Sequence, residues 1–425
     1  MLHNFRNYGY QDIRLTPDVN VFYGPNGVGK TNIIEAVYYL SIGRSFRTTR
    51  DRDLVKWDAH GFCIYADLEL YGKQKRFAVN YVLDGSKRIS VDGKRAFRRY
   101  DGSGGQWPSV VVFSPQDLYI VKGPPASRRA FLDLLISRAS KTYAKELWEY
   151  TRALNQRNAL LRSQEVREEV YAIWEERLAT TGSRIVSERQ RFLAEISKSA
   201  SRYYETLVAG AEELSMYYMI AGRDADGGLG GDDLLTATQA TTQAALQVAS
   251  QAKTQAKTLS RTEARAEATD PTSDVKTSDV KGFLFESLAR NRAKERHLGN
   301  TIVGPHRDDV AFFVDSKDAR VFGSQGQQRT VALSLRLAEV ELLTKTTGEV
   351  PVLLLDDVIS ELDELRRSQL LRNVFSGGQV LITTTSLQDV VLWLKGSDES
   401  TPYGIEVFEV TSGAEGPVIR SPSGR

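Results

Sequence analysis

The loop at residues 24–31, GPNGVGKT, constrains the fold more than any other stretch of this chain. It has the spacing G-x-x-x-x-G-K-[ST] of a loop whose backbone N–H groups surround phosphates. Residues 20–23, NVFY, read as a short buried strand, and residues 32–43, NIIEAVYYLSIG, have the apolar spacing of a helix. Strand, glycine-rich loop and helix follow in the order that such a loop requires. The sequence therefore predicts an α/β domain that binds a nucleoside triphosphate.

The last two residues of the loop are the ones that carry its chemistry. In this pattern Lys30 is expected to reach the β- and γ-phosphates, and Thr31 is expected to place its hydroxyl on Mg²⁺. A glycine-rich turn that only opens a helix is the alternative, and the flanking strand and helix make it the weaker one.

Two carboxylates follow a buried strand more than 300 residues later, in PVLLLDDVISELD at residues 351–363. Ligands of open α/β sheets bind at the carboxyl ends of the strands, where Asp356 and Asp357 are expected to lie. We expect Asp356 to bind Mg²⁺ and Asp357 to orient or deprotonate the attacking water. The alternative is a polar turn in which Ser360 and Asp363 cap the next helix.

A third candidate is the start of a helix in GSQGQQRTVALSLRLAEVELL, residues 323–343. Ser324 is placed as its N-cap, and an apolar-periodic helix follows. A serine and a glycine at a helix N-terminus form an anion site. An ordinary capped core helix is the alternative.

The composition limits the class of protein. The chain has 425 residues, and 56 basic against 54 acidic side chains leave a formal charge of +2, so a nucleic-acid surface would have to be local. A single cysteine, Cys63, excludes an internal disulfide and a cysteine-built zinc site. No apolar run approaches the roughly 20 residues of a membrane span, and the first residues lack the apolar core of a signal peptide. We expect a cytoplasmic protein with no membrane partner.

The patterning divides the chain into three parts. Residues 62–70 and 76–83 alternate, and two Asp-Gly turns follow, which predicts a β-meander up to about residue 100. Residues 109–118 contain another buried strand, and residues 125–222 have a helical pattern. Residues 223–280 are poor in large apolar residues, so we expect a solvated low-complexity insertion. Structure is expected to resume near residue 281, with a strand at 309–315 and two parallel strands near 350–357 and 378–385. The expected domains are an N-terminal head part at 1–120, a helical lobe at 121–300 and a C-terminal head part at 301–425.

Several long blocks together resemble a known family. They are NFRNY, GPNGVGKTNIIEAVYYLSIGRSFR, VKGPPASRRAFLD, NQRNALL, GPHRDD, FGSQGQQRTVALSLRLAE and LLLDDVISELD. Together they resemble the RecF family of bacterial recombination mediators, within the SMC and Rad50 class of ATPase heads. The resemblance implies an α/β fold: an ABC-type P-loop ATPase head with an inserted, mainly helical second lobe.

The resemblance also implies roles for single residues. Gly24, Asn26, Gly27, Gly29, Lys30 and Thr31 would hold ATP and Mg²⁺. Gln116 would couple metal and water to the helical lobe, as a metal and catalytic residue. Ser324, Gly326 and Gln327 would touch the γ-phosphate of ATP on a second subunit, with Ser360 and Asp363 in the loop that crosses that interface. Arg6 would lie near the nucleotide.

The implied function is ATP-dependent DNA binding in recombinational repair, replication and the SOS response. An ATP-dependent homodimer would bind single-stranded or gapped DNA and duplex DNA, hydrolyse ATP slowly as a weak DNA-stimulated ATPase, and act with RecR and RecO to load RecA. Three departures from the family stand out. The first strand is short or the start site is misassigned, residues 223–280 carry no transferable role, and Thr384 stands where a switch histidine is usual. A nucleotide-gated scaffold and an ABC transporter ATPase subunit are the alternatives.

Arginines after the first helix are the candidates for DNA contact. Arg44, Arg47 and Arg50, together with Arg52, suit phosphate contacts without sequence readout, as do Arg128 and Arg129. Solvated surface or internal ion pairs are the alternative for each of them. For His306 and Arg307 in GPHRDD we expect a structural role, paired with Asp308 or Asp309.

Overall fold

The chain folds into two compact units, seen in a computed structural model that describes residues 1–96, 107–163, 168–210, 212–222, 277–374, 377–387, 390, 404–413 and 416–421. The first unit is Met1–Asp117 with Glu339–Arg425, and the second is Leu118–Ala338. The predicted boundary at residue 301 differs from this division. Residues 301–338 lie in the second unit because the strand at 309–314 pairs with another strand of that unit.

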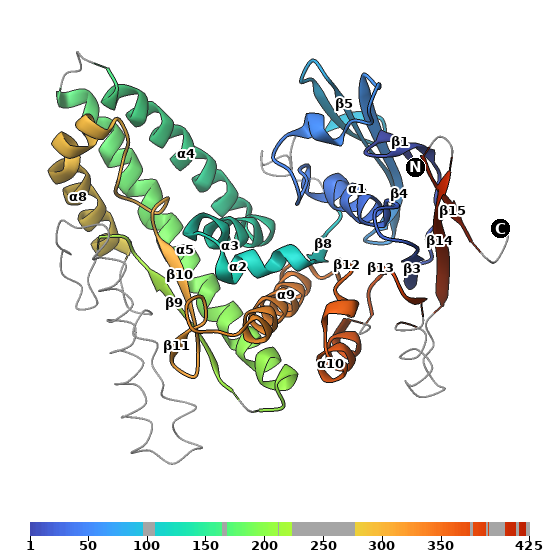
Figure 1. Ribbon diagram of the computed structural model, residues 1–425. Coiled ribbons are helices and arrows are strands. Elements are labelled where there is room, and N and C mark those ends of the chain that lie inside the picture. The colour runs from blue at the N-terminus through green and yellow to red at the C-terminus, as the bar shows by residue number, and fades with distance from the viewer. Residues whose placement is uncertain are drawn as a thin grey trace. The chain divides into compact units, whose positions relative to one another are not determined.

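An antiparallel sheet carries the N-terminal part of the first unit. Within the described residues it has six strands in the order β2-β1-β4-β5-β6-β7. Figure 1 labels β1, β4 and β5 of this sheet. Asp92 and Gly93, both at positive φ, form the turn between β6 and β7, as the Asp-Gly signal predicts. The β-meander is therefore confirmed. The strands are β1 Leu2–Phe5, β2 Tyr8–Gln11, β4 Gly61–Leu70, β5 Lys73–Val82, β6 Lys87–Val91 and β7 Lys94–Ala96.

A second sheet of the same unit carries the candidate site. Its six described strands have the order β15-β14-β3-β13-β12-β8, and all pairs from β14 to β8 are parallel. The predicted parallel pair is thus confirmed as β12 and β13, and the carboxyl ends of β3, β13, β12 and β8 meet at one edge. The strands are β3 Val19–Tyr23, β8 Val110–Phe113, β12 Val352–Asp356, β13 Val380–Thr384, β14 Ile405–Gly413 and β15 Gly416–Arg420.

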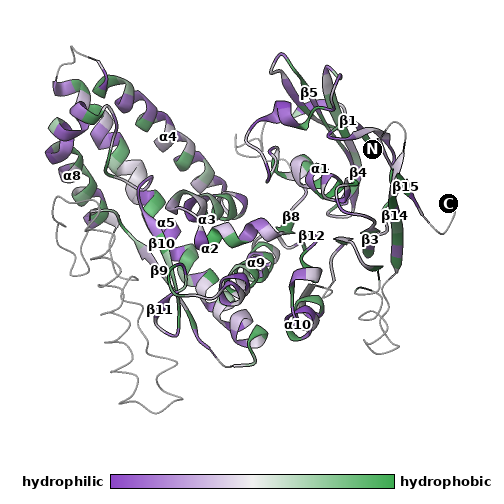
Figure 2. Cartoon of the chain, in the orientation of Figure 1, coloured by the Kyte–Doolittle hydropathy of each residue, from purple (hydrophilic) through white to green (hydrophobic). Residues whose placement is uncertain are grey.

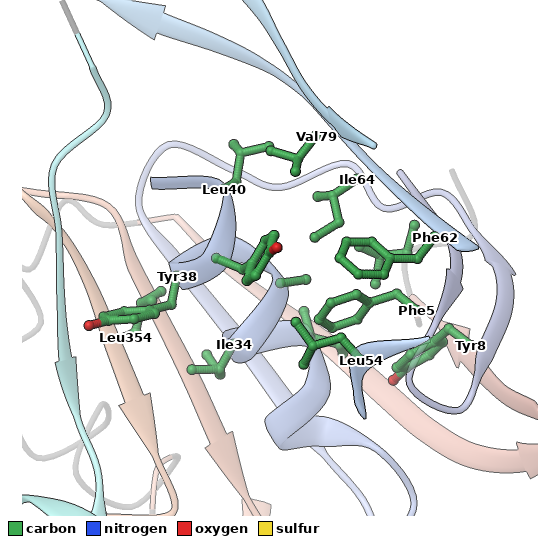
Figure 3. Close-up of a cluster of buried hydrophobic side chains, with 14 of the residues drawn as sticks. Phe5, Tyr8, Ile34, Tyr38, Leu40, Leu54, Phe62, Ile64, Val79 and Leu354 are labelled. Carbon is green, nitrogen blue, oxygen red and sulfur yellow. The ribbon is translucent and has the colours of Figure 1, made fainter. Parts of the chain in front are cut away.

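Helix α1, Lys30–Ile42, packs against strands of both sheets. Apolar side chains from β1, β4, α1 and β12 form one core around it (Figure 3). Phe5 and Phe62 meet edge to face with their ring centroids 5.3 Å apart. Because α1 begins directly after the glycine loop, this core fixes the position of the loop. The other helices of the unit are η1 Asp51–Leu54, η2 Pro115–Asp117, η3 Ile359–Glu361 and α10 Glu364–Val374.

The second unit is mainly helical, as predicted. Along α4 and α5 the ribbon changes repeatedly between hydrophilic and hydrophobic colours, as expected for helices that bury one face (Figure 2). Its helices are α2 Leu118–Lys122, α3 Pro125–Ala139, α4 Lys141–Leu161, α5 Glu168–Leu207, α8 Thr277–Leu298 and the first part of α9, Gln325–Thr347. Helix α8 starts before residue 281, where structure was expected to resume. Residues 223–276, most of the predicted low-complexity insertion, lie outside the described residues.

A three-stranded sheet in this unit corrects the prediction of an all-helical 125–222. Strand β9, Leu214–Met219, pairs antiparallel with β10, Asp309–Val314, and β10 pairs with β11, Lys317–Asp318. Leu214, Met216 and Tyr218 are buried in alternation, a strand period that is too short to stand out beside a long helix. In the part of the chain that the structure describes, no helix is long and apolar enough to cross a membrane.

Candidate nucleotide site

The glycine loop connects β3 to α1 and is closely packed on its inner side. Gly27 and Gly29 have φ values of 77° and 119°, which side-chain-bearing residues rarely adopt. A Cβ on Gly29 would lie 2.8 Å from Asn7 Nδ2, and one on Gly24 would lie 2.2 Å from the carbonyl oxygen of Val410 in β14. Asn26 and Gly27 are exposed on the outer side. The loop therefore needs its glycines both for conformation and for space.

The N-terminus of α1 is left open to an anion. Gly29 stands at the N-cap position, no side chain caps the helix, and its first turn contains no acidic residue. The first N–H groups of a helix have no partner within the helix. Together with the helix dipole they form an anion site, so the loop fits the phosphates that its sequence predicts.

Lys30 is buried with its ammonium group turned into the loop. Nζ donates to the carbonyl oxygens of Gly24 and Pro25, both at 2.8 Å, and the side chain is largely shielded from water. Burial lowers the pKa of Lys30, while the nearby carboxylates of Asp357 and Asp356 oppose that shift. The ammonium therefore lies inside the phosphate loop, held by uncharged acceptors.

Asp356 and Thr31 come together at the carboxyl edge of the sheet, as predicted. Thr31 Oγ1 donates to Asp356 Oδ1 at 2.8 Å, and Thr383 Oγ1 donates to the same oxygen at 2.8 Å. Burial raises the pKa of Asp356, and the bonds from Thr31 and Thr383 act in the opposite direction. A hydroxyl and one carboxylate are the protein oxygens with which Mg²⁺ is commonly held beside phosphates, so this pair fits the metal.

Thr383 was missed from the sequence, which directed attention to its neighbour Thr384. The parallel register pairs Asp356 with Thr383 across β12 and β13, which brings their side chains together. Thr384 is also buried, and its hydroxyl donates to the carbonyl oxygen of Ser386 at 3.0 Å. The signal that could have found Thr383 is its register opposite Asp356 in the neighbouring strand.

Asp357 follows Asp356 in a left-handed conformation, with φ 53°. Its N–H lies 3.1 Å from Thr383 Oγ1, and its carboxylate accepts from Ser360 Oγ at 3.0 Å. Asp363 caps α10 by accepting from the N–H of Arg366 at 2.9 Å. The capping alternative therefore holds for Asp363, whereas Ser360 positions the carboxylate of Asp357.

Gln116 lies at the same edge of the sheet. It belongs to η2, directly after β8, and the register pairs Phe113 of β8 with Leu355 of β12. Its side chain is exposed. The structure therefore places Gln116 at the strand ends that carry Asp356 and Asp357.

Arg6 supports the loop through the turn between β1 and β2. Its guanidinium forms a bidentate pair with the buried Glu35 of α1, at 2.8 and 2.7 Å, and also donates to the carbonyl oxygen of Asp53. The next two residues contact the glycine loop: Asn7 Nδ2 donates to the Val28 carbonyl at 3.1 Å, and Tyr8 OH donates to the Gly29 carbonyl at 3.2 Å. This bracing role was not foreseen. A direct contact between Arg6 and a nucleotide stays a prediction.

Comparison with known proteins shows the family to which this chain belongs. The family described as "RecF/RecN/SMC N terminal domain" matches residues 1–392. A protein of Symbiobacterium thermophilum named "DNA replication and repair protein RecF" is 37% identical over 91% of each chain. The chain belongs to the RecF family. A relative of the same name in Clostridium perfringens is 32% identical over 97% of each chain. The solved structure titled "Structure of the recombination mediator protein RecF-ATP in RecFOR pathway" superposes with a TM-score of 0.76 at 30% identity, covering 99% of this chain and 95% of that one. The predicted family and its ATPase-head fold are thereby confirmed.

Ser324, Gly326 and Gln327, called the signature segment below, lie in the second unit at the start of α9. Ser324 Oγ accepts from the N–H of Gln327 at 3.2 Å, and the Gln327 side chain accepts from the N–H of Ser324 at 2.9 Å. This is a reciprocal capping box. Gln327 Nε2 also donates to Glu212 at 2.9 Å, and Gly326 lies in the first turn. Ser324 is an N-cap, as predicted, and its contact with a second subunit stays a prediction.

The candidate DNA-binding arginines differ from one another. Arg44, Arg47 and Arg50 are all exposed, and Arg47 also donates to Asn32 at 2.9 Å and to Glu35 at 3.3 Å. Arg128 is buried and forms a bidentate pair with Asp309, so the prediction that it contacts DNA phosphates is wrong and the internal ion pair is correct. Arg129 donates to the carbonyl oxygen of Asp308 at 2.6 Å.

GPHRDD has the expected structural role but other partners. His306 Nδ1 lies 2.6 Å from Tyr150 OH, and Arg307 bonds the carbonyl oxygen of Thr301 at 3.1 Å. Asp308 accepts from Tyr218 OH at 2.7 Å. The predicted pairing of His306 and Arg307 with Asp308 or Asp309 is therefore wrong.

Proposed function

We propose that this chain is an ATP-dependent DNA-binding protein of recombinational repair and replication. One observation carries the proposal: Thr31 and Asp356 share a hydrogen bond of 2.8 Å beside the uncapped start of α1, with Lys30 buried in the same loop. The names of its relatives support it, since they describe a DNA replication and repair protein and a RecF–ATP structure in the RecFOR pathway.

The residues of the loop divide the work of binding. The open N–H groups of α1 hold phosphate oxygens, and Lys30 exchanges the carbonyls of Gly24 and Pro25 for them. Thr31 and Asp356 hold Mg²⁺, which when bound neutralises phosphate charge. Asn7 and Tyr8 keep the loop carbonyls in place. Gly24 and Gly29 let the loop pack closely on its inner side, and Asn26 and Gly27 lie on the exposed outer side, where they surround the phosphates.

Hydrolysis depends on the groups at the ends of β12 and β8. Asp357 accepts a proton from the attacking water, and Ser360 keeps its carboxylate oriented. Gln116 contributes from the end of β8. In this proposal turnover is slow and is stimulated by DNA, so that hydrolysis resets a bound state.

The active form is an ATP-dependent homodimer. Ser324, Gly326 and Gln327 of one subunit face the nucleotide of the other, with Asp363 at the same interface and Arg6 beside the nucleotide. The dimer holds single-stranded, gapped or duplex DNA through arginines such as Arg44 and Arg50, and acts with RecR and RecO to help load RecA.

Sedimentation velocity tests the proposal directly. The protein is run with ATP, with ADP, and with ATP plus gapped DNA, and phosphate release is followed with and without the same DNA. We expect dimers only with ATP, and a slow release of phosphate that DNA accelerates. Dimers without any phosphate release would support a nucleotide-gated scaffold instead, and monomers under all three conditions would refute the proposal.

A further inference from the structure

Trp57 is the most exposed of the large apolar side chains in the described part of the chain, at 91%. Tryptophan is usually mostly buried, because it offers the largest apolar area of any residue. No described residue of the first unit covers this ring, and the nucleotide site does not use it. An aromatic ring held in water in this way is available to a ligand.

The backbone presents Trp57 rigidly. The N–H of Ala59 donates to the carbonyl oxygen of Lys56 at 3.1 Å, and Asp58 has φ 64°, so residues 56–59 form a tight turn with Trp57 at its second position. The N–H of Lys56 bonds the carbonyl oxygen of Asn4 at 2.9 Å. Val55, just before the turn, bridges to Phe5. Binding at this ring therefore requires little ordering of the backbone.

Positive charge without a partner lies just before the turn. Arg50 and Arg52 are exposed, and no described residue pairs with either guanidinium. The carboxylates between and after them are engaged: Asp51 with Lys87 at 3.0 Å, and Asp53 with the Thr48 hydroxyl at 2.7 Å. Asp58, inside the turn, is exposed. Counted formally, Arg50, Arg52, Lys56 and Lys87 exceed Asp51, Asp53 and Asp58 by one charge, so this surface carries a small positive excess.

These features match one kind of ligand. An aromatic face beside guanidinium groups binds single-stranded nucleic acid, because the ring stacks on a base while the arginines hold phosphates. Bases inside an intact duplex are already stacked and are not available to the ring. We propose that Trp57, with Arg50 and Arg52, is a stacking site for an unpaired DNA base. This inference rests on the proposed DNA-binding function and specifies where the unpaired strand is held.

A protein partner is the competing occupant. Leu83 is 49% exposed and its N–H bonds the carbonyl oxygen of His60, so the surface has an apolar edge. The partnerless arginines favour nucleic acid over such a partner, since an apolar docking surface has no need of them. The experiment below separates the two.

The test compares Trp57→Ala with wild type in the full chain with ATP, using oligo-dT and blunt duplex DNA as probes. Stacking on one base corresponds to roughly a tenfold or greater affinity. We expect Trp57→Ala to weaken oligo-dT binding by on the order of tenfold and to leave duplex binding within about twofold. Trp57→Tyr should restore most of the loss. Trp148→Ala, which removes another exposed tryptophan from α4, should change neither affinity.

Two further measurements sharpen the result. Oligo-dT should quench tryptophan emission in wild type and in Trp148→Phe, and the quench should be lost in Trp57→Phe. Arg50→Ala and Arg52→Ala should each lower the salt slope of oligo-dT binding by roughly one. Thermal unfolding and ATP binding are measured for each variant, to show that the fold and the nucleotide site are intact.

The outcomes distinguish this inference from the function on which it rests. If wild type with ATP binds neither these probes nor gapped DNA, both are refuted, and if it binds gapped or duplex DNA but not oligo-dT, only the stacking site is refuted. If wild type binds DNA and Trp57→Ala binds both probes as well as wild type, only the stacking site is refuted. Equal losses for oligo-dT and duplex would also overturn it. Unchanged DNA binding with a weaker complex with purified RecR would make this surface a protein-docking site.

Discussion

The N-termini of α1 and α9 differ in whether a side chain caps them. At α1 a left-handed glycine occupies the N-cap and no side chain bonds the first N–H groups. At α9 Ser324 and Gln327 satisfy each other's backbone N–H groups. The first end is ready for an anion, whereas the second must give up its own cap before it binds one. That difference is consistent with the proposal that the glycine loop binds nucleotide within one subunit, whereas the signature segment binds the nucleotide of a second subunit only in the dimer.

Buried charges at the nucleotide site and in the core of the second unit differ in the same way. Lys30 donates to neutral carbonyls, and Asp356 accepts from neutral hydroxyls. In the second unit Arg189 forms a bidentate pair with Asp133, and the buried Arg157 pairs with the buried Glu175 at 2.9 Å. Charges satisfied within the protein stabilise a core, whereas charges held by weak neutral partners are free to exchange them for a ligand.

Asp357→Asn should produce the largest effect. The amide cannot accept a proton from water, so phosphate release should fall by roughly 10²–10⁴-fold while ATP still binds. ATP-dependent dimers should persist. Ser360→Ala is the matched control: it removes the bond that orients the carboxylate but leaves the base, so its loss should be smaller. Wild-type turnover by Asp357→Asn would transfer the role to another group, first of all Gln116.

Lys30→Ala should follow, with a loss of ATP affinity of roughly 100-fold or more. Charge-assisted bonds contribute about 1.5–3 kcal/mol each, and this ammonium would contact more than one phosphate oxygen. Equilibrium dialysis measures the loss, with Lys73→Ala, an exposed lysine of β5, as the control. Unchanged affinity would show that the open end of α1 is not the nucleotide site.

His306 and Asp308 are predicted to give opposite pH dependences of stability in the second unit. Burial lowers the pKa of His306 to about 4 from 6.5, so stability is lost as pH falls from 6.5 to 4 and the unfolded histidine takes up a proton first. Burial raises the pKa of Asp308 to about 6 from 3.8, so stability is gained as pH falls from 6 and the folded carboxyl takes up a proton first. Each effect amounts to at most about 3 kcal/mol. The charged and titratable groups around this pair are Tyr150, Tyr218, Arg129, Arg189 and Arg307.

In wild type the two contributions to stability nearly offset each other between pH 6.5 and 4. Urea unfolding across this pH range tests that prediction. Relative to wild type, His306→Gln should gain stability as pH falls, and Asp308→Asn should lose it. Parallel curves for all three proteins would mean that these two groups are not buried as the structure has them.

The parts predicted from sequence are those with local causes. The loop, β3, α1, β12 and Asp356 follow from a spaced motif and from runs of apolar residues whose period is visible within a dozen positions. Strand β9 was missed because its partner β10 lies about 90 residues further along the chain. Thr383 was missed because its bond to Asp356 depends on strand register. Glu35, the partner of Arg6, lies inside a helix pattern that reads as core, where a buried carboxylate gives no signal of its own.

Substitutions of Ser324 should have the smallest effect on stability, and they distinguish its role as a helix cap from its proposed contact with the nucleotide of a second subunit. Ser324→Ala removes the cap of α9 and should lower the stability of the monomer by about 1 kcal/mol. Ser324→Asp keeps a side chain that caps as well as serine, so monomer stability should match wild type. Its carboxylate, however, would repel a γ-phosphate across a dimer interface, and ATP-dependent dimers should be lost. Urea unfolding without nucleotide and sedimentation with ATP measure the two effects on the same samples. Normal dimers in Ser324→Asp would show that the start of α9 is only a capped helix. The N-termini of α1 and α9 would then differ in how they are capped, and α9 would bind no nucleotide.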